Sequence, residues 1–322
     1  FRLIICHILV KFPLDLLNPE EVSLLTTTPS TSISLQVFEF DMATVDIQSE
    51  SSDGNSVRVN SDRRKAQGFT EDIGNSVVLE VVYMPGDEFL MGSPETEAES
   101  YDEERPQQQV TVEPFFMGKY PVTQVQWQVV AALPKVDIDL NRNPSFFNGD
   151  NRPVECICWY DAVEFCKRLS QITKRNYWLP SEVEWEYACR AGTTTPFHLG
   201  ETITTELANY NGNYIYNHGD KGEYREQTTL VGSFPANAFG LYDMHGNIWE
   251  WCADTLHINY EGAPRDGSAW LKDYNTDNQM RLLRGGSWHS YPENCRCAYR
   301  YWSPSTHSSF NIGFRVVRRQ PF

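Results

Sequence analysis

The amino-acid sequence predicts an α+β protein with little regular secondary structure. Helix-forming patterns are confined to residues 123–190, whereas the 130 residues after Gly192 contain short strand-like segments and loops. Aromatic residues make up 13% of the chain and include nine tryptophans, which is typical of irregular cores and of recognition surfaces. A long segment with so little helix needs other stabilising interactions, and a bound metal ion is one way to provide them.

The composition indicates a folded protein and argues against several classes of function. Of its 322 residues 40% are hydrophobic, so a core can form and wholesale disorder is excluded. The formal net charge of −16 repels phosphate backbones, so nucleic acid is not an expected partner. No run of 18 apolar residues occurs in the sequence, and the apolar segment 3–10 is too short to span a membrane. Because that segment also lacks the small-residue cleavage site of a signal peptide, we expect a cytoplasmic protein.

Residues 1–76 are predicted to be an N-terminal extension or linker, partly disordered, that precedes a domain at residues 77–319. Residues 26–32 are rich in Ser, Thr and Pro, and residues 48–75 are rich in Ser, Asp, Asn and Arg, as linkers commonly are. Between these tracts, residues 35–45 alternate apolar and polar side chains, which predicts one strand.

The first part of the domain is predicted to be β-structure. Residues 77–84 form an apolar run that ends at a Pro-Gly pair, and residues 109–117 alternate apolar and polar side chains. The loop between them contains eight carboxylates and no basic residue from position 87 to position 104. A run of like charges of this kind indicates a solvated loop.

Three helices are predicted by their start signals. Thr123 and Ser181 are each followed three residues later by Gln or Glu, which is the pattern of a capping box. Asp161 opens the middle helix, and Gly192 ends the last one. The apolar face of the middle helix, at 3.6-residue spacing, consists of Ala162, Phe165, Cys166, Leu169 and Ile172.

The eight cysteines and seven histidines show no zinc-binding spacing. Cys156 and Cys158, like Cys295 and Cys297, are separated by one residue, whereas zinc motifs have two to four. His245 is interpreted as a packing residue. The even number of cysteines leaves a secreted disulfide framework as an alternative. The remaining histidines considered are scattered along the chain at His198, His218, His257, His289 and His307.

A series of short phrases occurs in one order along the chain. They are FLMGS at 89–93, KYPVT at 119–123, PVE at 153–155 with WYDA at 159–162, LPSEVEWEYA at 179–188, GLYDMHGNIWEW at 240–251, LRGGSW at 283–288 and NIGFR at 311–315. Together they resemble the formylglycine-generating enzyme (sulfatase-modifying factor) family over residues 77–319. The resemblance implies an elaborated C-type-lectin-like fold, which is α+β with low regular secondary structure.

The resemblance also implies one enzymatic activity, the copper-dependent oxidation of a cysteine to formylglycine by a sulfatase-modifying oxidase. The family's two copper-binding cysteines, five residues apart after the Gly-Gly-Ser-aromatic motif, fall at Ser290 and Cys295. A hydroxyl is a poor ligand for Cu(I), so copper is not expected, and this activity is kept as the alternative function. Cys295 is then interpreted as a small buried hydrophobic residue. Cys297 does not replace the missing ligand, because Cys295 and Cys297 on one strand would point to opposite faces.

The segment 289–310 has the composition of a recognition surface. It contains six Ser or Thr, three Tyr, two His, two Cys, one Trp and one Phe. Tyrosine and tryptophan give rigid contact area, and serine gives adaptable hydrogen bonds. Changing only the adenines of an Asn AAC codon yields every residue type in the segment except those of Trp302 and Glu293. This bias resembles the variable proteins of diversity-generating retroelements, many of which carry this fold. The alternative is an ordinary aromatic-rich strand and loop.

This second resemblance implies a protein that binds a protein or another macromolecule, with a diversified surface on a constant scaffold. The ligand-binding residues would be His289, Ser290, Tyr291, Glu293, Cys297, Tyr299, Tyr301, Trp302, Ser303, Ser305, Thr306, His307, Ser308, Ser309 and Phe310. The expected anchors are aromatic, since a few aromatic residues dominate most interfaces, and they are Tyr291, Tyr301, Trp302 and Phe310. The expected buried scaffold, whose arginines make internal charge-assisted bonds, is Arg284, Gly285, Gly286, Ser287, Arg296, Arg300, Gly313, Phe314 and Arg315.

A structural calcium ion is the expected cofactor. The family's ligands carry over to the side chains of Asp243 and Glu250 and to the carbonyl groups of Gly246 and Ile248. Hard oxygen ligands presented by a tight turn suit this ion. A second family site would begin at Asn209 and Tyr210 and take its acid near Glu223. The alternative is that the two acids accept hydrogen bonds from loop amides.

Overall fold

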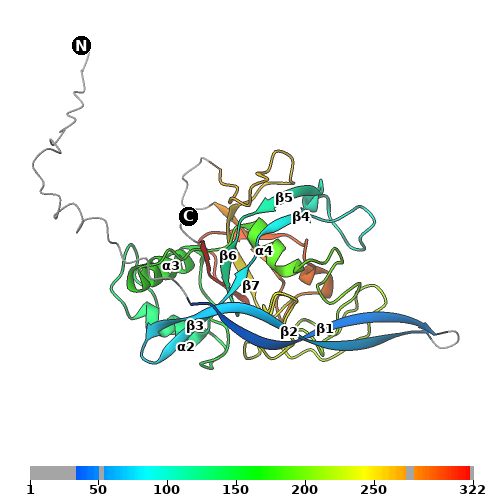
Figure 1. Ribbon diagram of the computed structural model, residues 1–322, viewed down its shortest axis with the longest axis horizontal. Helices are drawn as coiled ribbons and strands as arrows, with labels where there is room; N and C mark the ends of the chain where they lie inside the picture. Colours follow the sequence, from blue (N-terminus) through cyan, green and yellow to red (C-terminus); the bar gives the residue numbers. More distant parts are fainter. Residues whose placement is uncertain (1–33, 51–53, 273–278, 320–322) are drawn as a thin grey trace, which may run out of the picture. The chain divides into compact units, whose positions relative to one another are not determined.

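The computed structural model describes residues 34–50, 54–272 and 279–319. Within these residues the chain forms three sheets with a few short helices between them, which confirms the predicted α+β class (Figure 1). Residues 26–32, predicted as a linker, lie outside the described residues.

A five-stranded antiparallel sheet contains the first and the last strand of the described chain, at its two opposite edges. Its strand order is β1-β2-β3-β6-β11. The strands are β1 (Gln36–Glu50), β2 (Gly54–Gly74), β3 (Val77–Met84), β6 (Phe115–Gly118) and β11 (Val317–Arg319). The predicted strand 77–84 is confirmed with the same bounds, whereas the predicted strand 109–117 is broken at Glu113 and Pro114 into β5 and β6.

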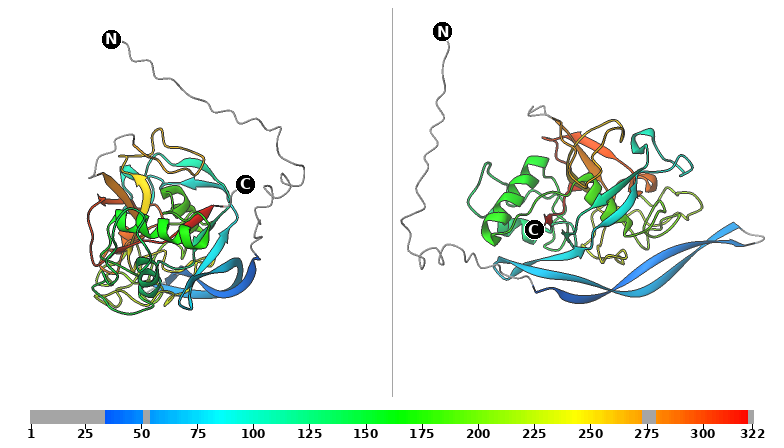
Figure 2. Two further views of the ribbon diagram at one scale, coloured as in Figure 1. Left: turned by 90° about the vertical axis from the view of Figure 1, so that its left-hand side faces the viewer. Right: turned by 45° about the horizontal axis from the view of Figure 1, so that its top comes forward.

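The interpretation of residues 48–75 as a linker is wrong. Residues 48–50 belong to β1 and residues 54–74 form β2, which pairs with β1 on one side and with β3 on the other (Figure 2). The exposed face of the hairpin of β1 and β2 carries charge pairs between strands instead of an apolar pattern. Arg63, for example, lies 3.1 Å from both Glu39 and Asp41. The domain therefore begins N-terminal to residue 77, and the chain from Leu35 onward forms one compact unit.

The hairpin is bonded to the rest of the domain at both of its strands. On β1, the Val45 amide donates to the Leu199 carbonyl at 2.6 Å, and the Asp41 carbonyl accepts from the Ala236 amide at 3.1 Å. On β2, the buried carboxylate of Glu71 pairs with Arg175 and accepts a hydrogen bond of 2.7 Å from the hydroxyl of Tyr177.

Replacing Tyr177 with phenylalanine should therefore destabilise the protein. The change removes one buried hydrogen bond to a charged group, and we expect the free energy of unfolding to fall by about 2 kcal/mol. Chemical denaturation of the two proteins measures the difference. A Tyr214→Phe variant is the control, because Tyr214 is 46% exposed and lies far from the hairpin in sequence. Equal stability of Tyr177→Phe and the unchanged protein would show that the hairpin is not docked as described.

Three α-helices lie between β6 and the second sheet. They are α2 (Gln124–Ala131), α3 (Trp159–Thr173) and α4 (Glu182–Arg190). The capping boxes predicted at Thr123 and Ser181 are both present. Helix α3 begins two residues before Asp161, whose carboxylate accepts from the Cys158 amide at 2.8 Å. None of the described helices is long and apolar enough to cross a bilayer.

The apolar faces of these helices build the core. Helices α2 and α3 pack against β2 and β3, and α4 packs against β4, β5, β7 and β8. On α3 the predicted apolar residues are buried except Ile172, which is 38% exposed. After α4 the chain turns through Ala191 and Gly192, both at positive φ, as the predicted helix end requires.

The second sheet carries the C-terminal half of the domain. Its strand order is β10-β7-β8-β9, and a separate hairpin pairs β4 with β5. The strands of the second sheet are β7 (Trp249–Thr255), β8 (Met280–Arg284), β9 (Tyr301–Pro304) and β10 (Ile312–Gly313). The hairpin consists of β4 (Asp87–Met91) and β5 (Gln108–Val112). Two short 3₁₀ helices, η2 (Asp102–Glu104) and η3 (Pro292–Cys295), complete the described elements.

Buried ion pairs join the C-terminal half to α4 and to the acidic loop. Arg284 pairs with Glu182 and Glu186 of α4, and Arg300 also pairs with Glu182. Arg296 pairs with Glu97 and Glu104 at 2.6 Å. The prediction that these arginines serve the scaffold is confirmed. The prediction of a fully solvated acidic loop is wrong for Glu97 and Glu104, whose side chains are 3% and 1% exposed.

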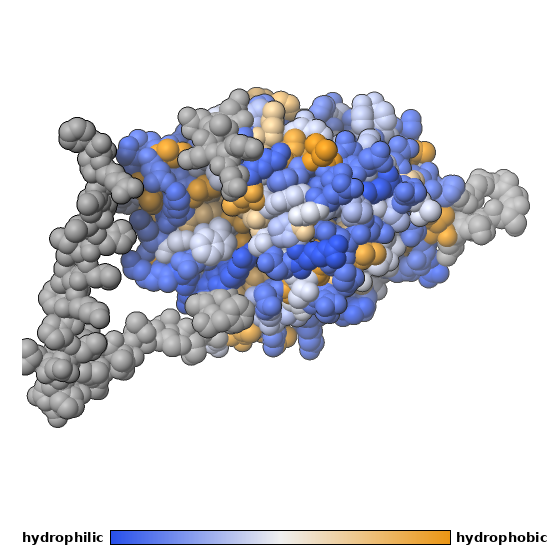
Figure 3. All heavy atoms as spheres, turned by 90° about the horizontal axis from the view of Figure 1, so that it is seen from above, coloured by the Kyte–Doolittle hydropathy of each residue, from blue (hydrophilic) through white to orange (hydrophobic). Residues whose placement is uncertain are grey.

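One face of the domain is shown in Figure 3, coloured by hydropathy. It is mainly hydrophilic, and its apolar side chains lie in separate patches.

Candidate functional site

A cavity of about 640 Å³ opens beside β7, where the segment 289–310 faces the loop around Asn211 and Tyr214. Much of the predicted binding segment lines this cavity. The predicted residues at its wall are His289, Ser290, Tyr291, Tyr299, Tyr301, His307, Ser309 and Phe310. The structure thus brings one part of the predicted ligand-binding set together around a common space.

Aromatic rings form a large part of the cavity wall. The ring of Tyr301 stacks on Trp249, with ring centroids 5.1 Å apart, and the rings of Tyr214 and Tyr291 are 4.3 Å apart. Tyr291, Tyr301 and Phe310 are 45%, 43% and 42% exposed. Rigid ring surface that faces solvent is the kind of surface from which interfaces gain most of their binding energy.

The cavity is electrically neutral apart from its histidines. Among the described residues that line it, none is Asp, Glu, Lys or Arg. Its polar groups are amides, hydroxyls and imidazoles. A hydrogen bond with Tyr214 raises the pKa of Tyr291, and burial raises the pKa of Tyr299, so both phenols remain neutral at physiological pH. Such a wall suits an uncharged or aromatic part of a ligand.

Other residues of the predicted binding set do not line the cavity. Cys297, Ser303 and Ser305 are 0%, 7% and 0% exposed, so their assignment to a binding surface disagrees with the structure. Trp302, a predicted anchor, is half-buried and packs against the main hydrophobic core. For Trp302 the cause is strand alternation, because β9 exposes Tyr301 and turns the next residue toward the opposite face. The rest of the predicted set lies outside the cavity wall, namely Glu293, Thr306 and Ser308.

Six cavity residues were not expected from the sequence. They are Asn211, Tyr214, Trp249, Asn294, Asn311 and Ile312. Asn211 and Tyr214 come from a loop about 80 residues before the segment, and its placement depends on a backbone bond from the Asn211 amide to the Ser290 carbonyl at 3.0 Å. The sequence contains no local signal of that contact.

Ser290 and Cys295 are not arranged as a pair of metal-binding thiols would be. The Ser290 hydroxyl is 3.0 Å from both the amide and the hydroxyl of Ser287. Cys295 is fully buried, does not line the cavity, and donates weakly to the Tyr291 carbonyl at 3.7 Å. Burial raises the pKa of its thiol, which keeps it protonated. The interpretation of Cys295 as a buried small residue agrees with this environment.

The two cysteines of the 295–297 pair differ in environment, although not for the predicted reason. They are not on one strand, because η3 ends at Cys295 and a turn follows. Cys295 belongs to a core cluster with Tyr210 and Phe197, whereas Cys297 belongs to the core around α4.

The predicted calcium residues lie in one buried neighbourhood. Both oxygens of Glu250 accept bonds of 2.6 Å from Arg315, and one accepts a further bond of 2.8 Å from Trp185. Glu250 therefore already has a cationic partner. Asp243 accepts from the Gly232 amide at 2.7 Å and forms none of the ion pairs among the described residues. Of the two carboxylates, only that of Asp243 has a negative charge that a described basic residue does not balance, and a metal ion would balance it.

The two predicted calcium sites adjoin each other. The side chain of Asn247 lies between them, 3.4 Å from a carboxylate oxygen of Asp243 and 3.3 Å from the amide nitrogen of Asn209. The side-chain oxygen of Asn209 is buried and has no hydrogen-bond partner. Glu223 does not join this group, because it is 66% exposed and pairs with Arg225. The oxygen donors that fit a hard cation are therefore those of Asp243 and Asn209.

We expect calcium to stabilise the protein through Asp243. Burial raises the pKa of Asp243 to about 6, so its charged form is held at a cost at neutral pH. A cation bound only by the native state would offset that cost. A chelator should lower the melting temperature at pH 7, calcium should restore it, and Asp243→Asn should respond to neither. A chelator without effect, together with calcium-free elemental analysis, would contradict the assignment.

The raised pKa of Asp243 also predicts how the stability of the protein changes with pH. Between the unfolded pKa near 4 and the folded value of about 6, the native state binds more protons than the unfolded state. The contribution of Asp243 to stability is thus present at acid pH and lost as the pH rises through 6. Without calcium, the stability of the unchanged protein relative to Asp243→Asn should fall by about 3 kcal/mol between pH 4 and pH 7.

Comparison with known sequences identifies the family. The profile of the sulfatase-modifying factor enzyme 1-like domain matches residues 69–320. A serine/threonine-protein kinase, Pkn1 of Chlamydia caviae, is 30% identical over 74% of this chain and 38% of its own length. The chain thus spans about two fifths of that relative. The formylglycine-generating enzyme of Mus musculus is 28% identical over 78% of each chain.

Comparison with solved structures agrees with the fold. PvdO from Pseudomonas aeruginosa is 32% identical and superposes with a TM-score of 0.65 over 79% of this chain and 98% of its own. Variable protein 1 of Treponema denticola is 24% identical, with a TM-score of 0.60 over 79% of this chain and 99% of its own. This second likeness supports the C-type-lectin-like fold alone. The chain belongs to the sulfatase-modifying factor enzyme 1-like domain family, to which formylglycine-generating enzymes also belong.

Proposed function

We propose that this chain is a ligand-binding variable protein of a diversity-generating retroelement, and that it displays a diversified surface on a C-type-lectin-like scaffold. The observation that carries the proposal is the cavity of about 640 Å³ built mainly by the segment with the biased composition. The buried scaffold residues Arg296 and Arg300 lie between its exposed members in the sequence. A surface that can change without loss of the fold requires this separation.

The two exceptions to the codon bias are also absent from the cavity wall, as constant residues should be. Trp302 and Glu293 are the residues in the segment that adenine changes in an AAC codon do not yield, and neither lines the cavity. Trp302 packs against the core, as a constant residue should. The biased residues Cys297, Ser303 and Ser305 are buried and are assigned to the scaffold as well.

The chemistry of the cavity favours a protein ligand. Exposed tyrosine and phenylalanine rings, with amides and hydroxyls between them, resemble the make-up of antibody binding surfaces. The described residues of the wall include none of the lysines or arginines that phosphate contacts need, which argues against a nucleic acid. Tyr291, Tyr301 and Phe310 are the proposed anchors, and Trp302 is no longer one of them.

Formylglycine generation is the second candidate, and the mouse relative is what favours it. The oxidase chemistry needs a thiol that a peptide substrate can approach. Here Ser290 lines the cavity, whereas Cys295 is buried away from it. A peptide that carries the sulfatase cysteine should therefore not become an aldehyde in the presence of copper. Aldehyde formation by the unchanged protein would favour this candidate over the first.

Two matched substitutions test whether the surface tolerates change. Ser308→Tyr adds a ring at an exposed position and should change the free energy of unfolding by less than about 0.5 kcal/mol. Ser305→Tyr adds the same ring at a position with no exposed surface and should cost about 2 kcal/mol or more. Thermal unfolding of both variants gives the comparison.

A library then tests the binding function itself. Randomising His289, Tyr291, Tyr301 and Phe310 should leave most members folded, and selection against an unrelated protein should yield binders. Sequencing the surrounding DNA should find a near-copy of the 289–310 coding segment beside a reverse transcriptase, differing at adenines of the copy. A library that unfolds as readily as Ser305→Tyr, or a locus without such a copy, would contradict the proposal.

A further inference from the structure

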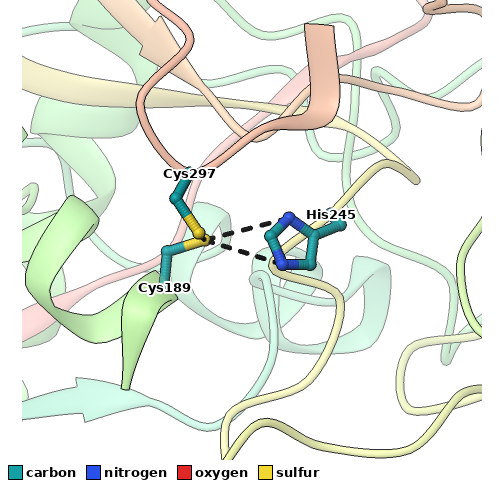
Figure 4. A group of neighbouring side chains, drawn as sticks. All are labelled: Cys189, His245 and Cys297. Atoms are coloured by element: carbon teal, nitrogen blue, oxygen red, sulfur yellow. Dashed lines mark hydrogen bonds between the residues drawn. The ribbon is translucent and has the colours of Figure 1, made fainter. Parts of the chain in front are cut away.

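A buried group of sulfur and nitrogen donors lies at α4, and none of its residues lines the binding cavity. Cys189 of α4, His245 of the tight turn and Cys297 after η3 point toward one another (Figure 4). Their ligand atoms all lie within 4.8 Å of one another, and the three residues are at most 3% exposed. They come from segments far apart in the sequence, so folding alone assembles them.

The spacing of these atoms approaches that of a metal site. The two sulfurs are 3.5 Å apart, and the sulfur of Cys189 is 3.9 and 4.0 Å from the nitrogens of His245. Around a tetrahedral zinc ion, bonds of about 2.3 Å to sulfur and about 2.0 Å to nitrogen place sulfurs about 3.8 Å apart and sulfur and nitrogen about 3.5 Å apart. The sulfur–sulfur distance of 3.5 Å is about 0.3 Å shorter than in this geometry, and the distance of 4.0 Å from the Cys189 sulfur to Nε2 of His245 is about 0.5 Å longer.

Hydrogen bonds determine which nitrogen of His245 is the donor atom. Its Nδ1 is 2.7 Å from the Cys295 carbonyl, which can only accept, so the ring proton resides on Nδ1. Metal-binding histidines usually donate their other ring N–H to a backbone carbonyl in this manner. The lone pair is then on Nε2, which accepts a 3.1 Å bond from the His198 amide. A metal ion would replace that bond.

The environment of His198 is a second, independent indication of a ligand at this site. Its side chain is 8% exposed, stacks on His245 with ring centroids 4.6 Å apart, and has no hydrogen-bond partner on either ring nitrogen. A buried polar group without a partner costs about 1–3 kcal/mol, so such groups require an explanation. A turn of this side chain toward the sulfurs would supply a fourth ligand.

We propose that Cys189, His198, His245 and Cys297 form a structural site for a thiophilic divalent cation, with zinc as the ion. Two thiolates and a divalent ion with neutral imidazoles sum to zero charge, which is the charge that a fully buried site tolerates best. A monovalent copper ion would leave a net negative charge in the core. The site ties α4 to the C-terminal segment without any involvement of the binding cavity, so it does not depend on the proposed function.

The chemistry of the cluster explains how the ion would enter. Burial raises the pKa of the Cys189 thiol and lowers the pKa of His245 to about 4, so without metal both side chains are neutral. Loading therefore releases the proton of the Cys189 thiol. It must also take place as the chain folds, because none of the four side chains is more than 8% exposed afterwards.

The test uses the full chain, produced and purified with a reductant that does not bind metals. Elemental analysis should find one zinc per chain. Protein produced with cobalt should show the visible absorption bands of tetrahedral cobalt and the near-ultraviolet band of a cobalt–thiolate bond. Cys189→Ser and Cys297→Ser should lose the bound metal and the thiolate band. Cys166→Ser, at a buried cysteine of α3 outside the group, should keep both.

His198→Asn keeps the proposal falsifiable if the cysteine variants do not fold. It leaves the two thiols in place and should shift the visible cobalt bands while the thiolate band persists. Reduced protein without bound zinc or cobalt overturns the proposal. So does metal content that is equal in Cys166→Ser and Cys297→Ser. A disulfide between Cys189 and Cys297, found by non-reducing mass spectrometry of folded protein kept in the reductant, overturns it as well.

Discussion

Replacing Arg296 with methionine should lower the free energy of unfolding by about 3–5 kcal/mol, because it leaves buried acids without their partner. The guanidinium donates to both oxygens of Glu104 at 2.8 and 2.6 Å and to Glu97 at 2.6 Å. It also bonds the Glu99 carbonyl at 2.7 Å, so it ties the whole acidic loop to the C-terminal segment. Because methionine preserves much of the side-chain volume, the loss of stability measures the removal of the positive charge. Urea denaturation at pH 7 measures it.

The pH dependence of this variant separates a lost ion pair from lost packing. Without Arg296, the burial that raises the pKa of Glu97 is no longer opposed by the guanidinium charge, so that pKa should rise further above the unfolded value. The variant should then regain stability as the pH falls toward 4, and a second change, Glu97→Gln, should restore part of it at pH 7. Arg63→Met is the control, because Arg63 pairs with Glu39 and Asp41 on the exposed hairpin and should show no measurable loss. A similar small effect of both substitutions would contradict the prediction.

Replacing Gly286 with alanine should destabilise the protein by about 3 kcal/mol through two separable causes. The residue has a φ of +74°, which an L-residue adopts only at a cost. An added Cβ would also come within 2.4 Å of the Cys295 sulfur and 3.1 Å of its Cα. Since η3 is held close to the Gly-Gly turn, little room is available for relief. Thermal and urea unfolding both give the loss.

Gly192→Ala is the matched control for the backbone effect alone. Gly192 has a φ of +91°, but a Cβ there would meet nothing within 4 Å. This variant should lose only the conformational part, about 1 kcal/mol. The difference between the two variants is the packing contribution at Cys295. If Gly286→Ala were as stable as Gly192→Ala, the close approach of η3 would not exist in solution.

Local features of the fold were predictable from short stretches of sequence. The capping boxes at Thr123 and Ser181 and the strand 77–84 depend on residues within a few positions of one another, and the structure confirms all three. The burial of the motif arginines also followed from the family motifs. The codon bias of residues 289–310 selected the segment that forms most of the cavity wall.

The features that could not be predicted depend on contacts between distant residues. Strand β2 resembled a linker, because its polar side chains are paired across strands that the sequence does not show as neighbours. Glu97 and Glu104 resembled solvated acids, because their partner Arg296 lies about 190 residues later. Trp302 resembled an anchor, because the register of β9, which turns it inward, is determined by β8.

By itself, the sequence determined the fold class, the positions of the helices, the family and the segment that provides most of the cavity. Each of these depends on short-range patterns or on motifs read in order. The tertiary structure alone decided which of the segment's residues face solvent and that Glu250 pairs with Arg315. It also decided that Cys189, His245 and Cys297 lie together and that His198 stacks on His245. The physical reason is that burial and pairing are properties of three-dimensional neighbours. A residue's own position in the chain does not specify them.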